Sequence, residues 1–294
     1  MKKLKHSAIA VIALATLLLA VTACIGTPSE QDGQISTIVS IGPANTEILA
    51  GLGFAGNIIA TDTFSANVPG IAPGISQIDM MALDLEHIIA LNPCIVIATD
   101  MIRHPGNPYP LTVVESVGIQ VVFVPVSDSI NGIRADIRML ANLLDAEEAG
   151  EAIVATMDAE ISSIAQIGAT ITNRRTVYFE LYPPPFMTSF GQGTFLQEML
   201  EIIGIDNIFA DQGAWVSVAD EIILQRNPDV ILTSMDTLPD PIGDITSRPG
   251  WGVITAVQNG DVFLIYADSS NRPSHNIVYA LRQIASAVYP EYFE

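Results

Sequence analysis

Residues 145–169 read DAEEAGEAIVATMDAEISSIAQIGA and contain no proline. Their apolar side chains recur at the spacing of one helix face, at Ala149, Ile153, Met157, Ile161 and Ile164. Asp145 and Glu148 are spaced as a capping box, which predicts that a helix begins here. About 23 helical residues would extend roughly 34 Å, with Gly150 as one flexible point near the start. Taken alone, such a helix either links two lobes or crosses over within a single α/β domain.

The sequence on one side of this helix resembles the sequence on the other. HIIALNPCIVIATD from His87 matches EIILQRNPDVILTS from Glu221 through an apolar helix, an Asn-Pro break and a β-rich run. Two further matches follow the same order along the chain: Gly53 with NIIA against Gly204 with NIFA, and GIQVVFVPV from Gly118 against GDVFLIYAD from Gly260. Short apolar runs that alternate with helices are typical of parallel sheets covered by helices.

The repeat decides between the two interpretations of the long helix. The sequence predicts an α/β fold of two Rossmann-like lobes with central parallel sheets, joined by one long rigid helix. The predicted boundaries are 37–144 for the N-terminal lobe, 145–169 for the linking helix and 170–294 for the C-terminal lobe.

The first 23 residues have the composition of a secretory signal peptide. Three lysines precede an apolar run, and VTAC at residues 21–24 resembles a lipobox, in which the chain is cleaved before a cysteine that is then lipidated. The sequence therefore predicts a signal peptide at 1–23, a lipid on Cys24 and a flexible tether at 24–36. Such a lipid would hold the protein extracytoplasmically, on the outer face of the cell membrane. Ordinary secretion with a chance cysteine is the alternative.

Acidic residues dominate the charge of the chain. It has 32 Asp and Glu against 12 Lys and Arg, a formal net charge of −20. All three lysines lie in the predicted signal peptide, so the rest of the chain carries only arginine as a permanent cation. Nucleic-acid binding needs a basic surface, and this composition excludes it. Cys94 lies in an apolar run and is predicted to be buried, and the sequence has no disulfide framework or zinc spacing.

Four segments resemble one family of proteins. TIVSIGPANTEILAGLG (37–53), DLEHIIALNPCIVIATD (84–100), FLQEMLEIIGIDNIF (195–209) and RPSHNIVYALRQIA (272–285) are similar to the substrate-binding proteins of ABC importers for vitamin B12, siderophores and haem. The resemblance implies a cleft between two lobes that holds a metal chelate. It implies no catalysis and no resident cofactor, since the cobalt or iron belongs to the cargo. We expect a monomer that delivers this cargo to a permease dimer with its ATPase subunits.

Loops at the carboxyl ends of the predicted strands are rich in aromatic, proline and glycine residues, and ligands of open parallel sheets bind at these ends. The aromatic candidates for a cleft wall, each of which could instead belong to the core of a lobe, are Phe64, Tyr109, Tyr182, Phe186, Trp215 and Trp251.

The segment ADSSNRPSHN (267–276) resembles the Asp-x-x-x-Arg segment that contacts the corrinoid in cobalamin binders, which implies that Asp268 and Arg272 bind the ligand. Arginine can hold a carboxylate, phosphate or amide oxygen in a bidentate way. Ser269 and Ser270 stand where some of those proteins have aromatic residues. The corrinoid, the iron–siderophore and haem therefore all remain open as the cargo.

Two glutamates match the positions at which this family meets its permease, Glu86 in DLEHI and Glu201 in MLEII. A carboxylate at an exposed rim contributes to orientation and encounter rate. The internal repeat of this chain, however, pairs Glu86 with Glu221.

Two other classes of function remain as alternatives. An enzyme on the same fold would need clustered ligands or an acid–base pair, and an anchored adhesion module would have a shallow cleft. The histidines outside the signal peptide, His87, His104 and His275, have no metal-ligand spacing, although a loop histidine could reach a metal from the cleft.

Overall fold

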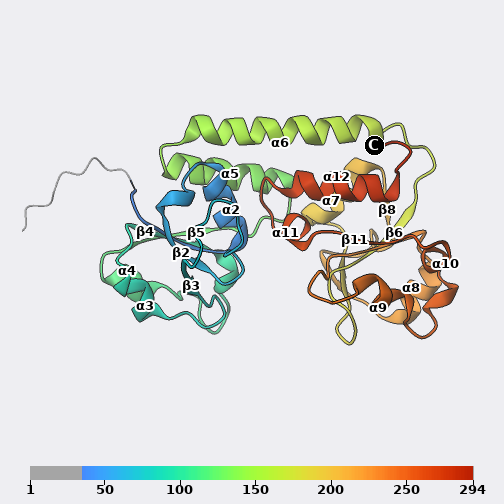
Figure 1. Ribbon diagram of the computed structural model, residues 1–294, viewed down its shortest axis with the longest axis horizontal. Helices are drawn as coiled ribbons and strands as arrows, with labels where there is room; N and C mark the ends of the chain where they lie inside the picture. The colour runs from blue at the N-terminus through green and yellow to red at the C-terminus, as the bar shows by residue number, and fades with distance from the viewer. Residues whose placement is uncertain (1–34, 294) are drawn as a thin grey trace, which may run out of the picture. The chain divides into compact units, whose positions relative to one another are not determined.

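The computed structural model describes residues 35–293 (Figure 1). The predicted signal peptide, Cys24 and most of the predicted tether lie outside these residues. None of the helices in this part of the chain combines the length and the hydropathy needed to cross a membrane.

The N-terminal lobe is built on a five-stranded parallel sheet with the order β3-β2-β1-β4-β5. Helices cover both faces of this sheet: Ile38 of β1 shares a core with α2 and α5, whereas Val39 shares another with α3 and α4. This double coverage explains why the strands are continuous apolar runs. The elements are β1 (Ile38–Ile41), α2 (Pro43–Gly51), η1 (Ala55–Asn57), β2 (Ile58–Asp62), β3 (Ser76–Ile78), α3 (Leu85–Ala90), β4 (Ile95–Thr99), η2 (Asp100–Ile102), α4 (Thr112–Ser116), β5 (Gln120–Val124) and α5 (Ile130–Leu143).

The C-terminal lobe is built on a four-stranded parallel sheet with the order β11-β10-β6-β8, beside an antiparallel pair, β7-β9. The elements are β6 (Thr176–Glu180), β7 (Thr188–Phe190), α7 (Phe195–Ile203), β8 (Asp206–Asn207), β9 (Trp215–Ser217), α8 (Asp220–Arg226), β10 (Val230–Thr233), α9 (Pro241–Thr246), η3 (Trp251–Val253), α10 (Thr255–Asn259), β11 (Val262–Leu264), α11 (Ala267–Ser270) and α12 (Ile277–Val288).

Four strands follow the same order in the two sheets, which confirms the repeat predicted from the sequence, and β3 is an additional edge strand of the N-terminal sheet. The order β2-β1-β4-β5 in one lobe corresponds to β8-β6-β10-β11 in the other. Asn92 and Asn227, which open the two Asn-Pro breaks, both have left-handed backbones, with φ of 46° and 43°. Each follows a helix and turns the chain into an interior strand of its sheet.

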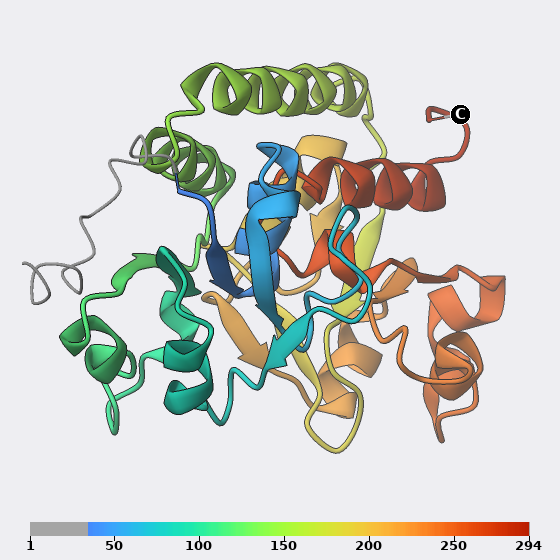
Figure 2. The same ribbon diagram turned by 60° about the vertical axis from the view of Figure 1, so that its left-hand side comes forward.

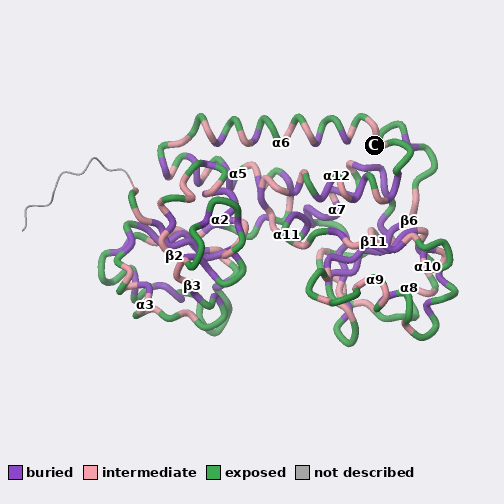
Figure 3. The backbone as a smooth tube through the Cα atoms, viewed as in Figure 1, coloured by how far each residue is buried: buried purple, intermediate pink, exposed green. Residues whose placement is uncertain are grey.

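The long helix α6 (Glu147–Gly168) extends across both lobes and is the one covalent link between the two sheets (Figures 1 and 2). It packs on α5 of the N-terminal lobe and on α7 and α12 of the C-terminal lobe. Its outer side is exposed (Figure 3). Its buried residues are alternately four and three positions apart, the spacing of helix-on-helix packing, at Gly150, Val154, Met157, Ile161, Ile164 and Gly168.

The predicted capping box at Asp145 and Glu148 is wrong. Asp145 has a φ of 52°, and its N–H donates to the carbonyl of Asn142 at 3.4 Å, while the N–H of Ala146 donates to the carbonyl of Ala141 at 2.8 Å. These two bonds form a Schellman motif, so Asp145 closes the end of α5 instead of capping the start of α6. The first turn of α6 has no side-chain cap, but it carries two glutamates, and negative charge is favoured there.

Glycines stand at both ends of the buried face of α6. A Cβ on Gly150 would lie 2.5 Å from the Cβ of Ala141 on α5, and a Cβ on Gly168 would lie 2.8 Å from the backbone of Ile203 on α7. The missing side chains therefore allow α6 to approach both helices closely. Gly150 is thus a packing position, which is a second role beside the flexibility predicted for it.

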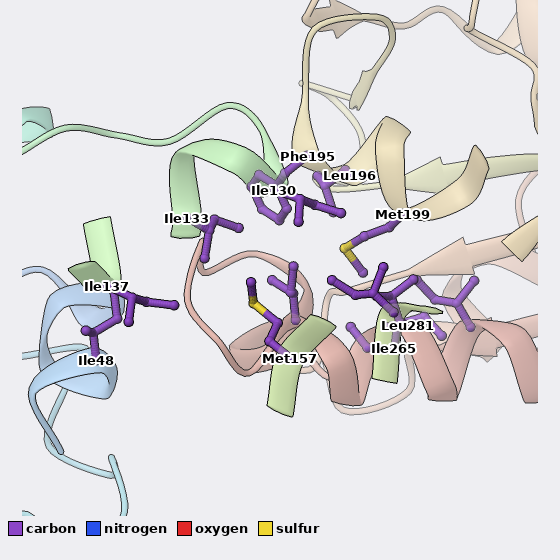
Figure 4. Close-up of a cluster of buried hydrophobic side chains, with 14 of the residues drawn as sticks. Ile48, Ile130, Ile133, Ile137, Met157, Phe195, Leu196, Met199, Ile265 and Leu281 are labelled. Atoms are coloured by element: carbon purple, nitrogen blue, oxygen red, sulfur yellow. The ribbon is translucent and has the colours of Figure 1, made fainter. Parts of the chain in front are cut away.

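A continuous hydrophobic core passes from one lobe to the other beside α6 (Figure 4). It contains Ile48 of α2, Ile137 of α5, Met157 of α6, Met199 of α7 and Leu281 of α12. The lobes thus share apolar burial in addition to a covalent link, which favours one fixed orientation between them.

Candidate functional site

A cleft of about 480 Å³ lies between the carboxyl ends of the two sheets. Every strand of the N-terminal sheet leads into it, since its lining includes Gly42 after β1, Phe64 after β2, Met80 after β3, Met101 after β4 and Pro125 after β5. The C-terminal lobe contributes the segments that follow β6, β10 and β11. Parallel α/β sheets bind ligands at this edge, and the volume is typical of small-molecule pockets, which hold about 300–1,000 Å³.

Four of the eight predicted ligand-binding residues line the cleft, namely Phe64, Tyr182, Asp268 and Arg272. Phe64 and Tyr182 come from opposite lobes, and both are exposed. The buried carboxylate of Asp62 accepts the backbone N–H groups of Phe64 and Gly42, each at 2.8 Å, and so fixes two cleft loops to the end of β2. A flat apolar side chain is therefore available on each wall.

The prediction that Trp251 binds ligand is wrong. Its side chain is 0% exposed, its indole N–H donates to Asp220 at 3.2 Å, and its ring lies edge-on to Tyr178 at 6.2 Å. Arg248 lies over the same ring at 4.6 Å and pairs with the buried carboxylate of Glu180. Trp251 is thus part of the core of the C-terminal lobe.

Three other aromatic residues predicted to bind ligand are exposed but do not line the cleft, namely Tyr109, Phe186 and Trp215. Phe186 lies between β6 and β7 and is 81% exposed. Trp215 begins β9 and pairs with Phe190 of β7. Tyr109 and Phe186 lie on loops as predicted, but loops on the same edge of a sheet do not all point into one cavity.

A buried polar contact, here called the Glu47 clasp, joins the two lobes beside the cleft. Glu47 of α2 is 4% exposed and accepts hydrogen bonds from three groups of the C-terminal lobe. The donors are Arg272 Nη1 at 2.8 Å, Asn276 Nδ2 at 3.0 Å and the hydroxyl of Ser274. Charge-assisted bonds of this kind, buried and mutually supported, hold the lobes in register.

Arg272 therefore lines the cleft with its charge already balanced. Besides Glu47, its guanidinium pairs with Asp268 at 2.5 Å and donates to the carbonyl of Phe64 at 3.1 Å. The sequence interpretation treated Asp268 and Arg272 as ligand contacts only, because Glu47 lies 225 positions away along the chain.

Methionine is the residue type in the cleft that the sequence interpretation missed. Four methionines line it: Met80, Met81, Met101 and Met235. Met81 and Met101 are exposed, which is unusual for so apolar a side chain. Thioether side chains are polarisable and adaptable, so they suit a bulky ligand of irregular shape. The consecutive pair Met80–Met81, just after a strand, was the available signal.

Asp136 on α5 also lines the cleft and was missed, because α5 itself was not predicted. Its carboxylate is buried and accepts the hydroxyl of Ser127 at 2.5 Å. Burial raises the pKa of Asp136 to about 6, against the opposing effect of the Ser127 hydrogen bond. The apolar spacing Ile130, Ile133 and Ile137 would have identified this helix.

No histidine of residues 35–293 lines the cleft. His87 meets the hydroxyl of Ser76 at 2.7 Å, and His104 lines a smaller cavity in the N-terminal lobe. His275 lines a second cavity of about 560 Å³ together with Glu47 of the clasp; this cavity adjoins the cleft, with which it shares Asp268 and Arg272, and burial lowers the pKa of His275. Within the described residues, no three His, Cys, Asp or Glu side chains are grouped to hold a metal ion.

The prediction that Cys94 is buried is wrong. Its thiol is exposed immediately before β4 and lies 3.3 Å from the hydroxyls of both Ser36 and Thr37. These hydrogen bonds lower the pKa of Cys94 to about 6. The apolar run that suggested burial begins one residue later, at Ile95.

Glu86 and Glu201, the two predicted permease contacts, are both exposed but lie on different sides of the lobes. Glu86 is in the first turn of α3, on the side away from α6 (Figures 1 and 2). Glu201 is in the last turn of α7, accepts the side-chain amide of Gln197 at 2.8 Å and lines a hollow with Ile161 of α6. Glu221, the repeat partner of Glu86, is exposed in the first turn of α8, on the same side as α3.

Comparison with known proteins is consistent with this geometry. An uncharacterized ABC transporter substrate-binding lipoprotein, YvrC of Bacillus subtilis, is 27% identical over 87% of this chain and 81% of its own length. A vitamin B12-binding protein of Vibrio campbellii is 26% identical over 90% of this chain and 91% of its own. The crystal structure of a possible iron-binding (periplasmic solute-binding) protein from Staphylococcus epidermidis superposes with a TM-score of 0.76 at 27% identity, covering 87% of this chain and 99% of that one.

The match to a whole family covers most of the chain. The periplasmic binding protein family profile matches residues 38–268, which include both sheets, the long helix and nearly all of the cleft lining. This chain therefore belongs to the periplasmic binding protein family.

Proposed function

We propose that this chain is the substrate-binding component of an ABC importer and that it captures a metal chelate in the cleft between its lobes. The observation that carries the proposal is the cleft of about 480 Å³ at the carboxyl ends of two parallel sheets, walled by aromatic and methionine side chains. The relatives named for vitamin B12 and for iron supply the cargo classes, which are cobalt and iron chelates.

The role is binding, and we assign the chain no catalytic step. The named relatives are binding proteins. The cleft is complete within one chain, which supports action as a monomer. The lipobox and the lipoprotein relative support an extracytoplasmic location with a lipid on Cys24.

The expected motion on binding is small. The Glu47 clasp, the shared core and the close helix contacts of α6 each oppose separation of the lobes. A rigid, preformed cleft suits a cargo that is itself rigid, because little ordering entropy is lost on binding. Small-angle scattering with and without ligand checks this; a wide closure of the lobes would contradict it.

Calorimetric titration with cyanocobalamin, ferric siderophores and haemin tests the binding function. Phe64→Ala and Tyr182→Ala should each weaken binding of the recognised chelate about tenfold, since each removes one aromatic contact. Tyr109→Ala and Phe186→Ala are matched controls from outside the cleft and should leave affinity unchanged. If no chelate binds, the proposal fails.

Delivery requires contact with a permease dimer and its ATPase subunits, and we assign this contact to Glu86 and Glu221 in place of Glu86 and Glu201. The supporting observations are the repeat, the equivalent first-turn positions on α3 and α8, and the exposure of both carboxylates. The double variant Glu86→Arg/Glu221→Arg should abolish uptake while ligand binding persists. The double variant Glu86→Arg/Glu201→Arg should take up ligand at the same rate as the single variant Glu86→Arg. A lower rate in that double variant would support Glu201 as a permease contact.

A further inference from the structure

Every arginine in residues 35–293 has its charge balanced by a carboxylate. The nine ion pairs are Arg103–Asp100, Arg134–Asp158, Arg138–Glu151, Arg174–Asp206, Arg175–Asp261, Arg226–Asp211, Arg248–Glu180, Arg272–Glu47 and Arg282–Glu160. The same residues contain no lysine. A ligand that carries carboxylates or phenolates therefore finds no free guanidinium or ammonium group on this part of the chain.

The charged side chains of the cleft are one cation and three carboxylates. The cation is Arg272, which is 16% exposed and shared between Glu47 and Asp268. Two of the carboxylates, Asp236 after β10 and Asp268 after β11, are exposed in the C-terminal wall, while Asp136 is buried in the N-terminal wall. The cleft surface that meets a ligand is thus net negative.

The rest of the lining has little to offer an anion. Its other side chains are uncharged: the methionines and aromatics described above, proline and small residues, and the hydroxyls of Thr99, Tyr182, Ser234 and Thr237. The amide of Asn271 already donates to Ser234 at 3.0 Å, and the amide of Asn45 donates to the carbonyl of Ile41 at 3.2 Å. An anionic ligand would lose hydration here without gaining a charged donor, which opposes binding. A ligand with a neutral organic exterior loses much less.

We infer that the cleft selects metal chelates of neutral or positive net charge and rejects polyanionic ones. The inference rests on the proposed function and narrows its cargo. Corrinoids and ferric hydroxamates meet the requirement. Haem, with its two propionates, and ferric tris-catecholates do not. The net negative charge of the whole chain acts in the same direction, because it lowers the encounter rate of anions.

A charge-graded panel tests this inference on the intact chain. The probes are ferrioxamine B as a cation, cyanocobalamin and ferrichrome as neutral chelates, and haemin and ferric enterobactin as anions, all titrated by calorimetry at one pH. The tightest ligand should be a cation or a neutral chelate, and the anions should bind at least about a hundredfold more weakly. Raising the ionic strength from about 0.02 M to about 0.5 M should narrow that gap, since salt screens the repulsion.

A charge-reversal variant tests whether the discrimination against anionic ligands arises from the charges in the cleft. Asp236→Lys should strengthen binding of the anionic probes on the order of tenfold relative to its effect on the neutral probe cyanocobalamin. Glu115→Lys, on the exposed surface of α4, changes the net charge equally outside the cleft and should have no such effect. Circular dichroism of both variants confirms that they fold.

The outcomes separate this inference from the proposed function. Tightest binding of haemin or ferric enterobactin overturns the charge selection and leaves the binding function standing. An equal gain from Glu115→Lys overturns the assignment to the cleft. Failure of every probe to bind overturns both.

Discussion

Replacing Glu47 with alanine removes the acceptor at the centre of the clasp between the lobes. Three donors lose their shared partner: Arg272 at 2.8 Å, Asn276 at 3.0 Å and the hydroxyl of Ser274, a residue with no exposed surface. Breaking a buried ion pair from one side costs about 3–5 kcal/mol, because the remaining charge is left without compensation. Arg272 retains Asp268, which is largely exposed, so we expect the lower half of that range.

Urea denaturation followed by circular dichroism measures this loss as a lower midpoint at constant slope. Glu47→Gln should lose less, because its amide oxygen still accepts a hydrogen bond, and Glu86→Ala should change the free energy of unfolding by less than about 0.5 kcal/mol as an exposed control. A double-mutant cycle with Arg272→Ala isolates the pair. A loss below about 1 kcal/mol for Glu47→Ala, or a coupling near zero, would refute the argument that the clasp holds the lobes together.

Two further predictions concern single positions. Asp136→Asn should raise the free energy of unfolding at pH 7 by up to ~3 kcal/mol. Its folded pKa of about 6 lies above the ordinary 3.8, so the native protein loses stability as pH rises from about 4 to about 6. The variant should lack that decline in pH-dependent urea melts, and an unchanged decline would contradict the assignment to Asp136. Gly168→Ala should lower the free energy of unfolding by about 1–3 kcal/mol, because its Cβ would meet the backbone of α7, which cannot rotate away. Gly252→Ala, whose Cβ would meet nothing within 4 Å, is the control, and equal losses in both would exclude steric contact as the cause.

Local patterns in the sequence were enough to predict the two-lobed architecture. The Asn-Pro breaks at Asn92 and Asn227 marked equivalent helix-to-strand turns, and their left-handed backbones follow from asparagine's tolerance of that conformation. The ends of α7 are also marked by local residues, because Thr194 caps its start and Gly204 ends it. Asp145 shows the limit of such patterns: one acidic residue between two helices fits either helix end, and only the backbone conformation decides.

Less of the site could be predicted from the sequence, because its contacts join residues that are far apart in the chain. The pairing of Glu47 with Arg272 joins opposite ends of the sequence, and no local spacing reports it. Trp251 directly follows SRPG (247–250) and Phe64 directly precedes SANVPG (65–70), yet the first is fully buried and the second is exposed in the cleft wall. Burial of an aromatic residue depends on which lobe element packs against it, and short-range composition does not contain that information.

Gly150 and Gly168 constrain the length of α6 as well as its packing on the two lobes. The two positions are 18 residues apart, five full helical turns, so their contacts with α5 and α7 lie on the same helix face about 27 Å from each other. One inserted residue would turn the second contact by about 100° around the helix axis and face it away from its partner. Proteins of this architecture should therefore vary the width of the cleft through its loops, and should lengthen this helix only in steps close to whole turns.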